Sequence, residues 1–257
     1  MLRALIRITL LLAWLIVLYP PVFIAHHGRR NLARDWMIRL FYKGVLAICG
    51  IRLSVTSRLS DARPLMLVSN HVSYLDIPII NSIANICFTP KSEIASWPIV
   101  GGACRIAESI FIERSANALL KAKSAIERML LSGRVVFLYP EATTGNGIDM
   151  LPFKSSFFTL AEEPIAGREL FIQPMALVYK RINEKPIAKE DWPRVAWYGD
   201  MVLLPHLWQF LQFKTLEVEI AFLNPVTIRG YGTRKALALH CQQDIAGYIA
   251  RARSALK

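Results

Sequence analysis

Short runs of consecutive apolar residues alternate with segments of helical periodicity along most of this chain. The runs at residues 65–68, 86–89, 135–138 and 170–179 contain few polar side chains, which is typical of strands buried on both faces. Residues 115–131 carry apolar side chains at helical spacing, with Ser115 as the predicted N-cap and Gly133 beyond the end. Strands that alternate with helices predict a single α/β domain whose mostly parallel sheet is flanked by helices.

The remaining segments predict further elements of the same kind. We expect a helix over residues 74–84, in which Pro78 is tolerable only within the first turn. Residues 109–112 favour a strand, and residues 92–105 an irregular helix broken by a proline and two glycines. The alternating pattern of residues 216–222 favours a strand at the sheet edge, and Thr233 opens a C-terminal helix.

The N-terminal segment Ala4 to Ile24 is rich in apolar residues, and Arg7 is its only charge. A helix of about 20 residues is roughly 30 Å long, which matches the hydrocarbon core of a bilayer. Pro20 and Pro21 interrupt its end, so a spanning, a kinked and a half-inserted helix all stay open. The basic start also fits a signal peptide, but residues 22–27 show no small-x-small cleavage pattern, which favours an uncleaved anchor.

The net charge is +12, from 31 basic and 19 acidic residues. Such a charge suits either nucleic acid or anionic lipid as a partner. Between residues 29 and 48 the basic side chains are mixed with aromatic and aliphatic ones, which is typical of an interfacial helix on an anionic membrane. We therefore expect membrane lipid rather than nucleic acid, with residues 1–50 as anchor and interfacial helix, and residues 51–257 as the folded domain.

The four cysteines are scattered, without CxxC or His/Cys metal spacing. This distribution argues against a disulfide framework and against a metal site, and it favours reduced thiols in a domain that faces the cytosol.

His71 is the first candidate for chemistry. It closely follows the strand at residues 65–68 and precedes a helix for which Ser73 is a plausible N-cap. Asp76 lies five residues later, and on one regular helix the two side chains would point about 140° apart. If His71 lies in the turn and Asp76 in the first helical turn, the carboxylate can reach the imidazole. The pair would then act as a general base oriented by an acid.

Three further segments carry polar groups at strand ends. Arg114 precedes a helix N-terminus, a position that favours phosphate, although pairing with Glu113 or Glu108 explains it equally well. Glu141 follows a buried strand within a loop rich in hydroxyl groups. Pro174 lies inside an apolar strand, where a proline marks an edge, a bulge or a strand end.

In this order, the four segments resemble the motifs of the glycerolipid acyltransferase family, nearest to the bacterial 1-acyl-sn-glycerol-3-phosphate acyltransferases. Asn70, His71 and Asp76 match its N-H-x4-D motif, and residues 111–114 match its apolar strand ending in Arg. Residues 139–143 resemble its F-P-E-G-T motif, and residues 172–174 its strand with a proline. The resemblance covers roughly residues 60–180, and the ordered set is specific.

The resemblance implies transfer of a fatty acyl group from acyl-CoA or acyl-carrier protein, both substrates rather than cofactors, to a lysolipid hydroxyl. His71 would deprotonate that hydroxyl, and Asp76 would stabilise the imidazolium. Lysophosphatidic acid, giving phosphatidic acid, is the expected acceptor. The resemblance assigns substrate binding to Asn70, Arg114, Glu141, Thr143, Lys91 and Lys154.

Two departures leave the acceptor open. Ala142 replaces the usual glycine, so the loop should not readily take a positive φ there, and Tyr139 replaces the usual phenylalanine. The aromatic-rich segment 196–208 resembles bacterial members, some of which acylate lyso-ornithine lipids. The same segment is otherwise explained as a cover over the acyl channel or as a second membrane contact. His206 within it is then a packed or an interfacial histidine rather than a catalytic one.

Other mechanisms and classes fit less well. Ser73 lies near His71 but lacks a G-x-S-x-G elbow, which disfavours a covalent acyl-enzyme. A non-catalytic lipid-binding protein would explain Ala142 but not the intact His71 and Asp76. Because both donors are cytosolic and the acceptor is a lipid, we expect the inner membrane, with the domain facing the cytoplasm.

Overall fold

The computed structural model describes residues 1–27, 32–84, 86–90, 92–96, 101–102, 104, 109–112 and 118–256. Its elements in chain order are α1 (Leu2–His27), α2 (Leu32–Cys49), β1 (Ile51–Val55), β2 (Leu65–Ser69), α3 (Asp76–Asn81), β3 (Cys87–Phe88), η1 (Ser92–Ser96), α5 (Ala118–Leu131), β4 (Val135–Leu138), η2 (Ser155–Ala161), β5 (Phe171–Ile182), β6 (Lys185–Pro186), η3 (Lys189–Arg194), α6 (Leu203–Phe210), β7 (Leu216–Phe222), η4 (Ile228–Gly230) and α7 (Arg234–Ser254).

One seven-stranded sheet organises the described chain. Its order is β1-β7-β5-β2-β4-β3, with β6 paired to β5. The pairs β1–β7, β5–β2, β2–β4 and β4–β3 are parallel, whereas β7 and β6 run antiparallel to β5. This arrangement confirms the predicted α/β class and the mostly parallel sheet.

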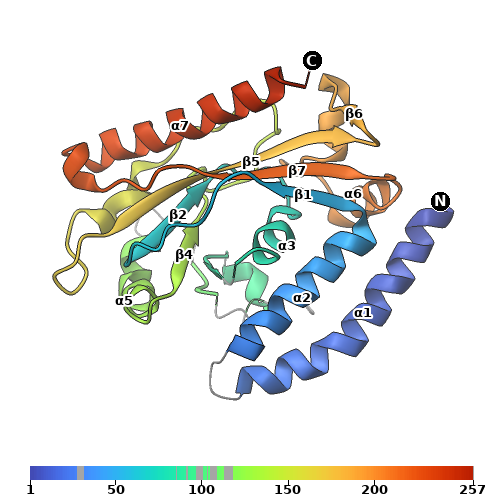
Figure 1. Ribbon diagram of the computed structural model, residues 1–257, viewed down its shortest axis with the longest axis horizontal. Helices are drawn as coiled ribbons and strands as arrows, with labels where there is room; N and C mark the ends of the chain where they lie inside the picture. The colour runs from blue at the N-terminus through green and yellow to red at the C-terminus, as the bar shows by residue number, and fades with distance from the viewer. Residues whose placement is uncertain are drawn as a thin grey trace.

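The two faces of the sheet carry separate apolar cores because side chains alternate along each strand. On β2, Leu65 and Leu67 enter the core shared with α2 and α3, while Met66 and Val68 enter the core shared with α5 and α7. Helix α7 lies across one face of the sheet, and α1 to α3 lie beyond the other (Figure 1). The loops at the carboxyl ends of β2 and β4 therefore lie between these two helical layers.

Several predicted elements are present with altered bounds. Helix α3 is shorter than residues 74–84, and Pro78 is its third residue, within the first turn as required. Helix α5 ends shortly before Gly133, which adopts φ +80°; its proposed cap Ser115 lies outside the described residues. Segment 109–112 does not form a regular strand. It lies beside β3, because Ile110 and Ile112 donate backbone hydrogen bonds to the carbonyls of Phe88 and Pro90.

The prediction that residues 216–222 form a sheet edge is wrong. Strand β1, which the sequence pattern did not reveal, pairs with β7 from the outside. Polar residues alternate with apolar ones on β7, but this does not mean that they face solvent. Glu219 is buried, and its carboxylate accepts hydrogen bonds from Lys180 and Tyr248. Pro174 does not lie in an edge strand, because β5 lies between β7 and β2. It directly precedes Met175, where the β5–β7 ladder ends opposite Phe222.

The N-terminal apolar segment forms one helix, α1, which continues through Pro20 and Pro21 to His27. The prolines therefore do not end it, although each one removes a backbone hydrogen bond. Within the described residues, no helix combines the length and apolar character needed to cross a bilayer. Buried Arg7 joins α1 to the sheet domain by donating to the carbonyls of Leu211, Phe213 and Lys214.

Candidate active site

Residues 70–76, which the motif resemblance predicts to carry the catalytic pair and which we therefore name the catalytic segment, begin where β2 ends. The side-chain amide of Asn70 donates to the carbonyl oxygen of Leu177 on β5 at 2.9 Å, and its Oδ1 accepts from the Leu177 N–H at 2.9 Å. Asn70 therefore takes the place of a paired strand residue while the main chain turns away from the sheet. This anchor fixes the origin of the loop that carries the next residue, His71.

His71 and Asp76 make the contact that their positions in the turn and the first helical turn predict. Nδ1 of His71 lies 2.7 Å from Oδ2 of Asp76, which also accepts the backbone N–H groups of Val72 and Ser73. Since the carboxylate accepts, the Nδ1 atom carries the proton and Nε2 is left to accept one. Asp76 is fully buried, whereas the His71 side chain is 18% exposed, so a substrate can reach the imidazole.

Two tyrosines complete the surroundings of this pair. The Tyr179 hydroxyl on β5 donates to Oδ1 of Asp76 at 2.5 Å, so both carboxylate oxygens are held. The Tyr139 ring stacks on the imidazole with centroids 3.7 Å apart. Its hydroxyl is buried without a hydrogen-bond partner among the described residues, and burial raises its pKa well above the usual value. The stack restricts rotation of the imidazole.

Glu141 braces the catalytic segment. Its Oε1 accepts the backbone N–H of His71 at 3.0 Å, and its Oε2 accepts that of Leu151 at 3.2 Å. Burial raises the pKa of this carboxyl to about 7, against the opposing effect of the two backbone hydrogen bonds. In this geometry Glu141 orders the loop that leads to His71. The substrate contact that the resemblance assigned to it stays a prediction.

Ala142 adopts φ +62°. The loop thus takes the left-handed conformation that we expected an alanine to resist, and the expectation is wrong on this point. The backbone N–H of Ala142 donates to the Tyr139 carbonyl at 3.0 Å, which closes a turn around Pro140 and Glu141. That turn directs the Glu141 carboxylate toward the backbone N–H of His71. The left-handed alanine and the Glu141–His71 hydrogen bond therefore depend on the same turn.

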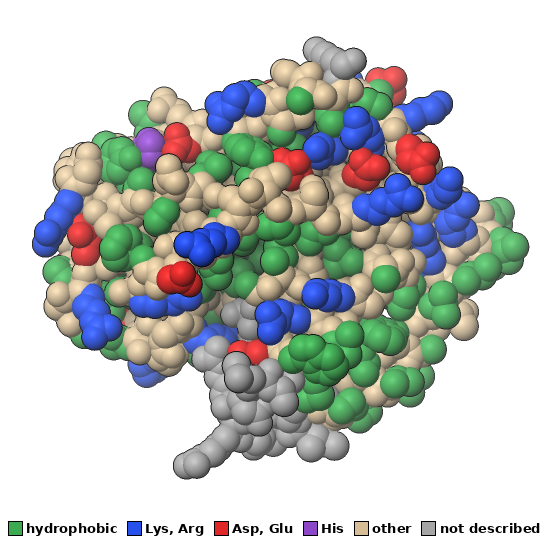
Figure 2. Space-filling model, in the orientation of Figure 1, with side chains coloured by type: hydrophobic (Ala, Val, Ile, Leu, Met, Phe, Trp, Pro, Cys, Tyr) green, Lys and Arg blue, Asp and Glu red, His purple; other side chains and the backbone are tan. Residues whose placement is uncertain are grey.

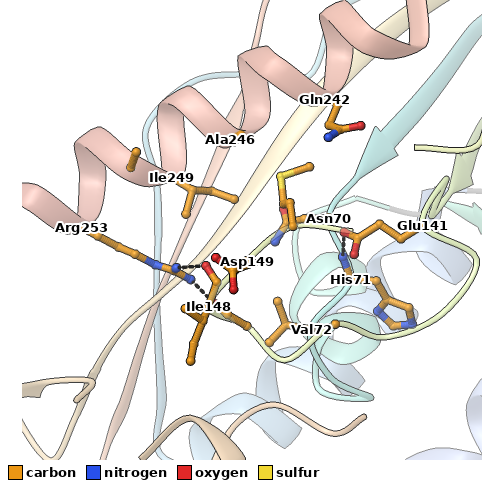
Figure 3. Close-up of a pocket in the computed structure, with 14 residues that line it drawn as sticks. Asn70, His71, Val72, Glu141, Ile148, Asp149, Gln242, Ala246, Ile249 and Arg253 are labelled. Atoms are coloured by element: carbon orange, nitrogen blue, oxygen red, sulfur yellow. Dashed lines mark hydrogen bonds between the residues drawn. The ribbon is translucent and has the colours of Figure 1, made fainter. Parts of the chain in front are cut away.

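A cavity of about 490 Å³ lies between α7 and the loop after β4. Figure 3 shows Arg253 and Gln242 reaching it from α7, and the His71 ring turned away from Arg253. The cavity therefore lies beside the catalytic segment, with the C-terminal helix as its far wall.

Arg253 fastens the loop that borders this cavity. It donates to the carbonyls of Gly147 and Ile148 and stacks on Trp192 at 4.4 Å. Gly147 has φ +77°, and a Cβ there would lie 2.3 Å from the Trp192 ring, so only glycine fits. The same loop donates the Gly145 N–H to the His71 carbonyl. The C-terminal helix thus holds a loop that is bonded to the main chain of His71.

The aromatic-rich segment packs against the catalytic segment from the other side. The backbone N–H of Trp197 donates to the Val72 carbonyl at 3.0 Å. His206 is buried, and its two ring nitrogens lie 3.1 Å from the Tyr74 hydroxyl and the Ala196 carbonyl. Burial lowers the pKa of His206. His206 is therefore a packed histidine, the first of the two predicted alternatives, and it bonds Tyr74, which lies between His71 and Asp76.

Other predicted site residues lie elsewhere. Lys91 and Arg114 fall outside the described residues. Thr143 is exposed, and Lys154 presents an exposed side chain while its N–H donates to the Pro140 carbonyl. Ser73 does not cap α3: its N–H donates to Asp76, and its buried hydroxyl has no partner in the described part of the chain.

Three contributors to the site could not be recognised in the sequence. Tyr179 lies 103 positions from Asp76, and Arg253 lies near the end of the chain, so no local pattern connects them to His71. Trp192 sits in the short 3-10 helix η3, where its aromatic ring was the one visible signal. A tyrosine inside a buried strand is the best available hint, because its hydroxyl requires a partner.

Comparison with known proteins places these motifs in a family. A family model described as "Acyltransferase" matches residues 50–178. The chain belongs to the acyltransferase family. A lyso-ornithine lipid O-acyltransferase from Brucella abortus (strain 2308) is 33% identical over 240 residues, which covers 91% of this chain and 90% of that protein. A 1-acyl-sn-glycerol-3-phosphate acyltransferase from Neisseria gonorrhoeae is 30% identical over 211 residues, 81% and 78% of the two chains.

The fold has a solved counterpart among acyltransferases. The crystal structure of the 1-acyl-sn-glycerophosphate acyltransferase PlsC from Thermotoga maritima matches with a TM-score of 0.72 and 17% identity, covering 98% of this chain and 95% of that one. The likeness confirms the acyltransferase fold that the sequence motifs predicted, with a curled sheet between helical layers.

Proposed function

We propose that this acyltransferase esterifies the free hydroxyl of a lyso-ornithine lipid, using His71 as general base. The observation that carries the reaction is the 2.7 Å contact between His71 and a fully buried Asp76, with Nε2 left to accept a proton. The choice of acceptor is supported by the relative from Brucella abortus, which matches more of this chain than the glycerophosphate enzyme from Neisseria gonorrhoeae does.

The chemistry follows from the pair. Nε2 of His71 takes the hydroxyl proton as the oxygen attacks the thioester carbonyl of acyl-CoA or acyl-carrier protein. The carbon–sulfur bond breaks, and the thiolate takes the proton back from the imidazolium, giving an ester and a free thiol. Asp76 stabilises the imidazolium in between, and Tyr179 and two backbone N–H groups hold the carboxylate in place.

The proposed acceptor sets one condition on the site. Ornithine itself carries no hydroxyl, so the hydroxyl that is acylated must lie on the acceptor's acyl chain. The head group presents a carboxylate and an ammonium rather than a phosphate. Arg114 then binds the carboxylate, which its planar fork suits as well as a phosphate. We assign supporting contacts with the head group to Lys91, Thr143 and Lys154.

Lysophosphatidic acid is the second candidate, and the Neisseria gonorrhoeae relative favours it. The two acceptors differ in charge: a phosphate monoester carries up to two negative charges, whereas the ornithine head group is zwitterionic. A site selective for phosphate therefore needs more positive charge than one selective for ornithine.

We place the enzyme on the inner membrane surface, with the catalytic domain in the cytoplasm. The outward face of α1 supports this location, because its apolar side chains are between 48% and 72% exposed at Leu5, Ile6, Leu10, Ile16 and Val17. An apolar helix face next to basic residues is typical of a helix that lies in one leaflet.

The test uses purified full-length protein, acyl-CoA or acyl-carrier protein, and a panel of lyso-ornithine lipid, lysophosphatidic acid and lysophosphatidylcholine, with release of free thiol as the readout. We expect the highest kcat/KM for lyso-ornithine lipid. His71→Ala should lower kcat by about 100-fold or more, the usual contribution of a general base. His240→Ala is the matched control, because it removes a second His–Asp pair, with Asp244, on α7.

Preference for lysophosphatidic acid would transfer the proposal to the second acceptor while keeping the reaction. Absence of thiol release with every acceptor and both donors, or unchanged release from His71→Ala, would overturn the enzymatic function and leave a non-catalytic lipid-binding protein.

A further inference from the structure

A second hollow lies on the α2 side of the sheet, away from His71. Its volume is about 420 Å³, within the range of small-ligand sites. We call it the α2–β1 groove; its lining residues are Arg39, Lys43, Leu46, Ala47, Ile51, Leu53, Val55, Ser82 and Ile83. In Figure 2, hydrophobic side chains form the recessed surface between β1 and α2, and basic side chains lie on its α2 side.

The groove exists because α2 and β1 diverge. They are joined by a single residue, Gly50, which has φ +73° and would place a Cβ 2.6 Å from the Lys214 carbonyl. From this tight turn the strand faces α2 with every second residue. Exposure rises along that row, from 7% at Ile51 to 43% at Val55, as the helix moves away. The result is a wedge with an apolar floor.

Two cations line the helical wall of the wedge. Arg39 and Lys43 are one turn apart on α2, on the same side as Leu46 and Ala47 nearer to the turn. Neither has an ion pair or a side-chain hydrogen bond with any described residue, and the acid one turn earlier, Asp35, is engaged in an interaction of its own. Two uncompensated positive charges above an apolar floor complement an anionic amphiphile.

We propose that the α2–β1 groove binds one anionic phospholipid of the membrane, distinct from the acceptor. Arg39 and Lys43 hold its phosphate at the wide end, and one acyl chain lies over Leu46, Ile51 and Leu53. The proposal rests on the membrane location inferred above but not on acyl transfer, because no residue of the groove belongs to the catalytic segment. Its consequence is that the enzyme selects anionic bilayers through a defined site as well as through its overall charge.

The test is a lipid titration of the detergent-solubilised full chain, followed by native mass spectrometry. We expect one phosphatidylglycerol per chain, bound at least about tenfold more tightly than phosphatidylcholine with the same acyl chains. Arg39→Gln/Lys43→Gln should weaken phosphatidylglycerol binding by at least about tenfold, since two charge-assisted contacts are lost. Val55→Asp, at a half-exposed position, should also weaken it by placing a negative charge at the wide end.

The matched control is Lys185→Gln/Lys189→Gln, which removes two exposed positive charges, also four residues apart in the sequence, on β6 and η3. Equal weakening by this control, or equal affinity for both lipids, would overturn the proposal in favour of unspecific charge attraction. If inorganic phosphate competes as strongly as the lipid, the groove binds an anion without an acyl chain, and this result would also overturn the proposal. His71→Ala should bind phosphatidylglycerol normally, so loss of acyl transfer and loss of groove binding are separate results.

Discussion

Ala142 is a non-glycine residue of the candidate site with a left-handed backbone. At φ +62° its Cβ crowds the following carbonyl, which destabilises a non-glycine residue by about 1–2 kcal/mol. The alanine nevertheless lies directly after Glu141, whose carboxylate accepts the backbone N–H of His71 and that of Leu151. Strain retained beside a functional group indicates that the surrounding contacts determine the turn.

We predict that Ala142→Gly raises the free energy of unfolding by about 0.5–1 kcal/mol. Relief of the left-handed strain exceeds the additional chain entropy that glycine loses on folding. Urea denaturation measures the difference. Ala125→Gly in helix α5 is the control and should lower the stability by about 1 kcal/mol. Equal losses in both variants would mean that the turn is not strained.

Glu141 gives a second prediction, on pH. Its pKa is raised to about 7 by burial, whereas an unfolded glutamate has a pKa of about 4.3. Between about pH 4.5 and 7 the folded protein therefore binds more protons than the unfolded one, and this group makes stability fall as the pH rises through that window. The fall should amount to about 3–4 kcal/mol, because a tenfold change in proton affinity corresponds to roughly 1.4 kcal/mol.

The measurement compares urea denaturation of the wild type and Glu141→Gln at several pH values from 4.5 to 8. The glutamine cannot ionise, so the difference in stability between the two proteins should change across the window and level off above it. Curves that run parallel throughout would show that Glu141 titrates normally.

At the scale of elements, α7 does more than cover the sheet. Its last turns carry Arg253, which bonds two loop carbonyls and stacks on Trp192, and burial lowers the pKa of this guanidinium to about 10. The loop that it holds donates the Gly145 N–H to the His71 carbonyl at 2.8 Å. The C-terminal helix thus supports the catalytic segment from a distance.

We predict that Arg253→Gln lowers the free energy of unfolding by about 3 kcal/mol, from lost charge-assisted hydrogen bonds and a lost cation–π contact. Exposed Arg251 lies on the same helix, and Arg251→Gln should change stability by less than about 0.5 kcal/mol. Chemical denaturation, monitored by tryptophan fluorescence, measures the stability of the two variants. Similar losses in both variants would show that α7 is stabilised by its charge alone.

The sequence predicted those features of the fold and site that depend on interactions between residues close together in the chain. The apolar runs predicted β2, β4 and β5, and the position of His71 before a helix predicted its contact with Asp76, because all of these depend on neighbouring residues. The position of β7 depended on β1, which lies 165 residues earlier where Ile51 faces Leu216, and β7 was mistaken for an edge. Tyr179 and Arg253 reach the site only after the sheet has formed, so no spacing in the sequence revealed them.

For the whole molecule, the proposed membrane association has two sources, the charge of +12 and the apolar face of α1. Salt screens attraction between charges beyond roughly 3 Å at about 1 M, but it leaves apolar burial intact. We therefore predict that about 1 M salt alone does not release the full-length protein from inner-membrane vesicles, whereas detergent does.

Sedimentation of washed vesicles, followed by immunodetection of the protein in pellet and supernatant, measures this. Release by salt would contradict apolar insertion of α1 and would make the association purely electrostatic.

Arg7 also sets an order of events during synthesis. The three carbonyls that hold it belong to residues 211, 213 and 214, so 204 to 207 residues separate the guanidinium from its acceptors. At a translation rate of about 5–20 residues per second, Arg7 is synthesised roughly 10–40 seconds before those carbonyls are. During that interval the helix has no docking place on its own domain, while its apolar surface is already available. The nascent chain should therefore meet the bilayer first and complete its catalytic domain there.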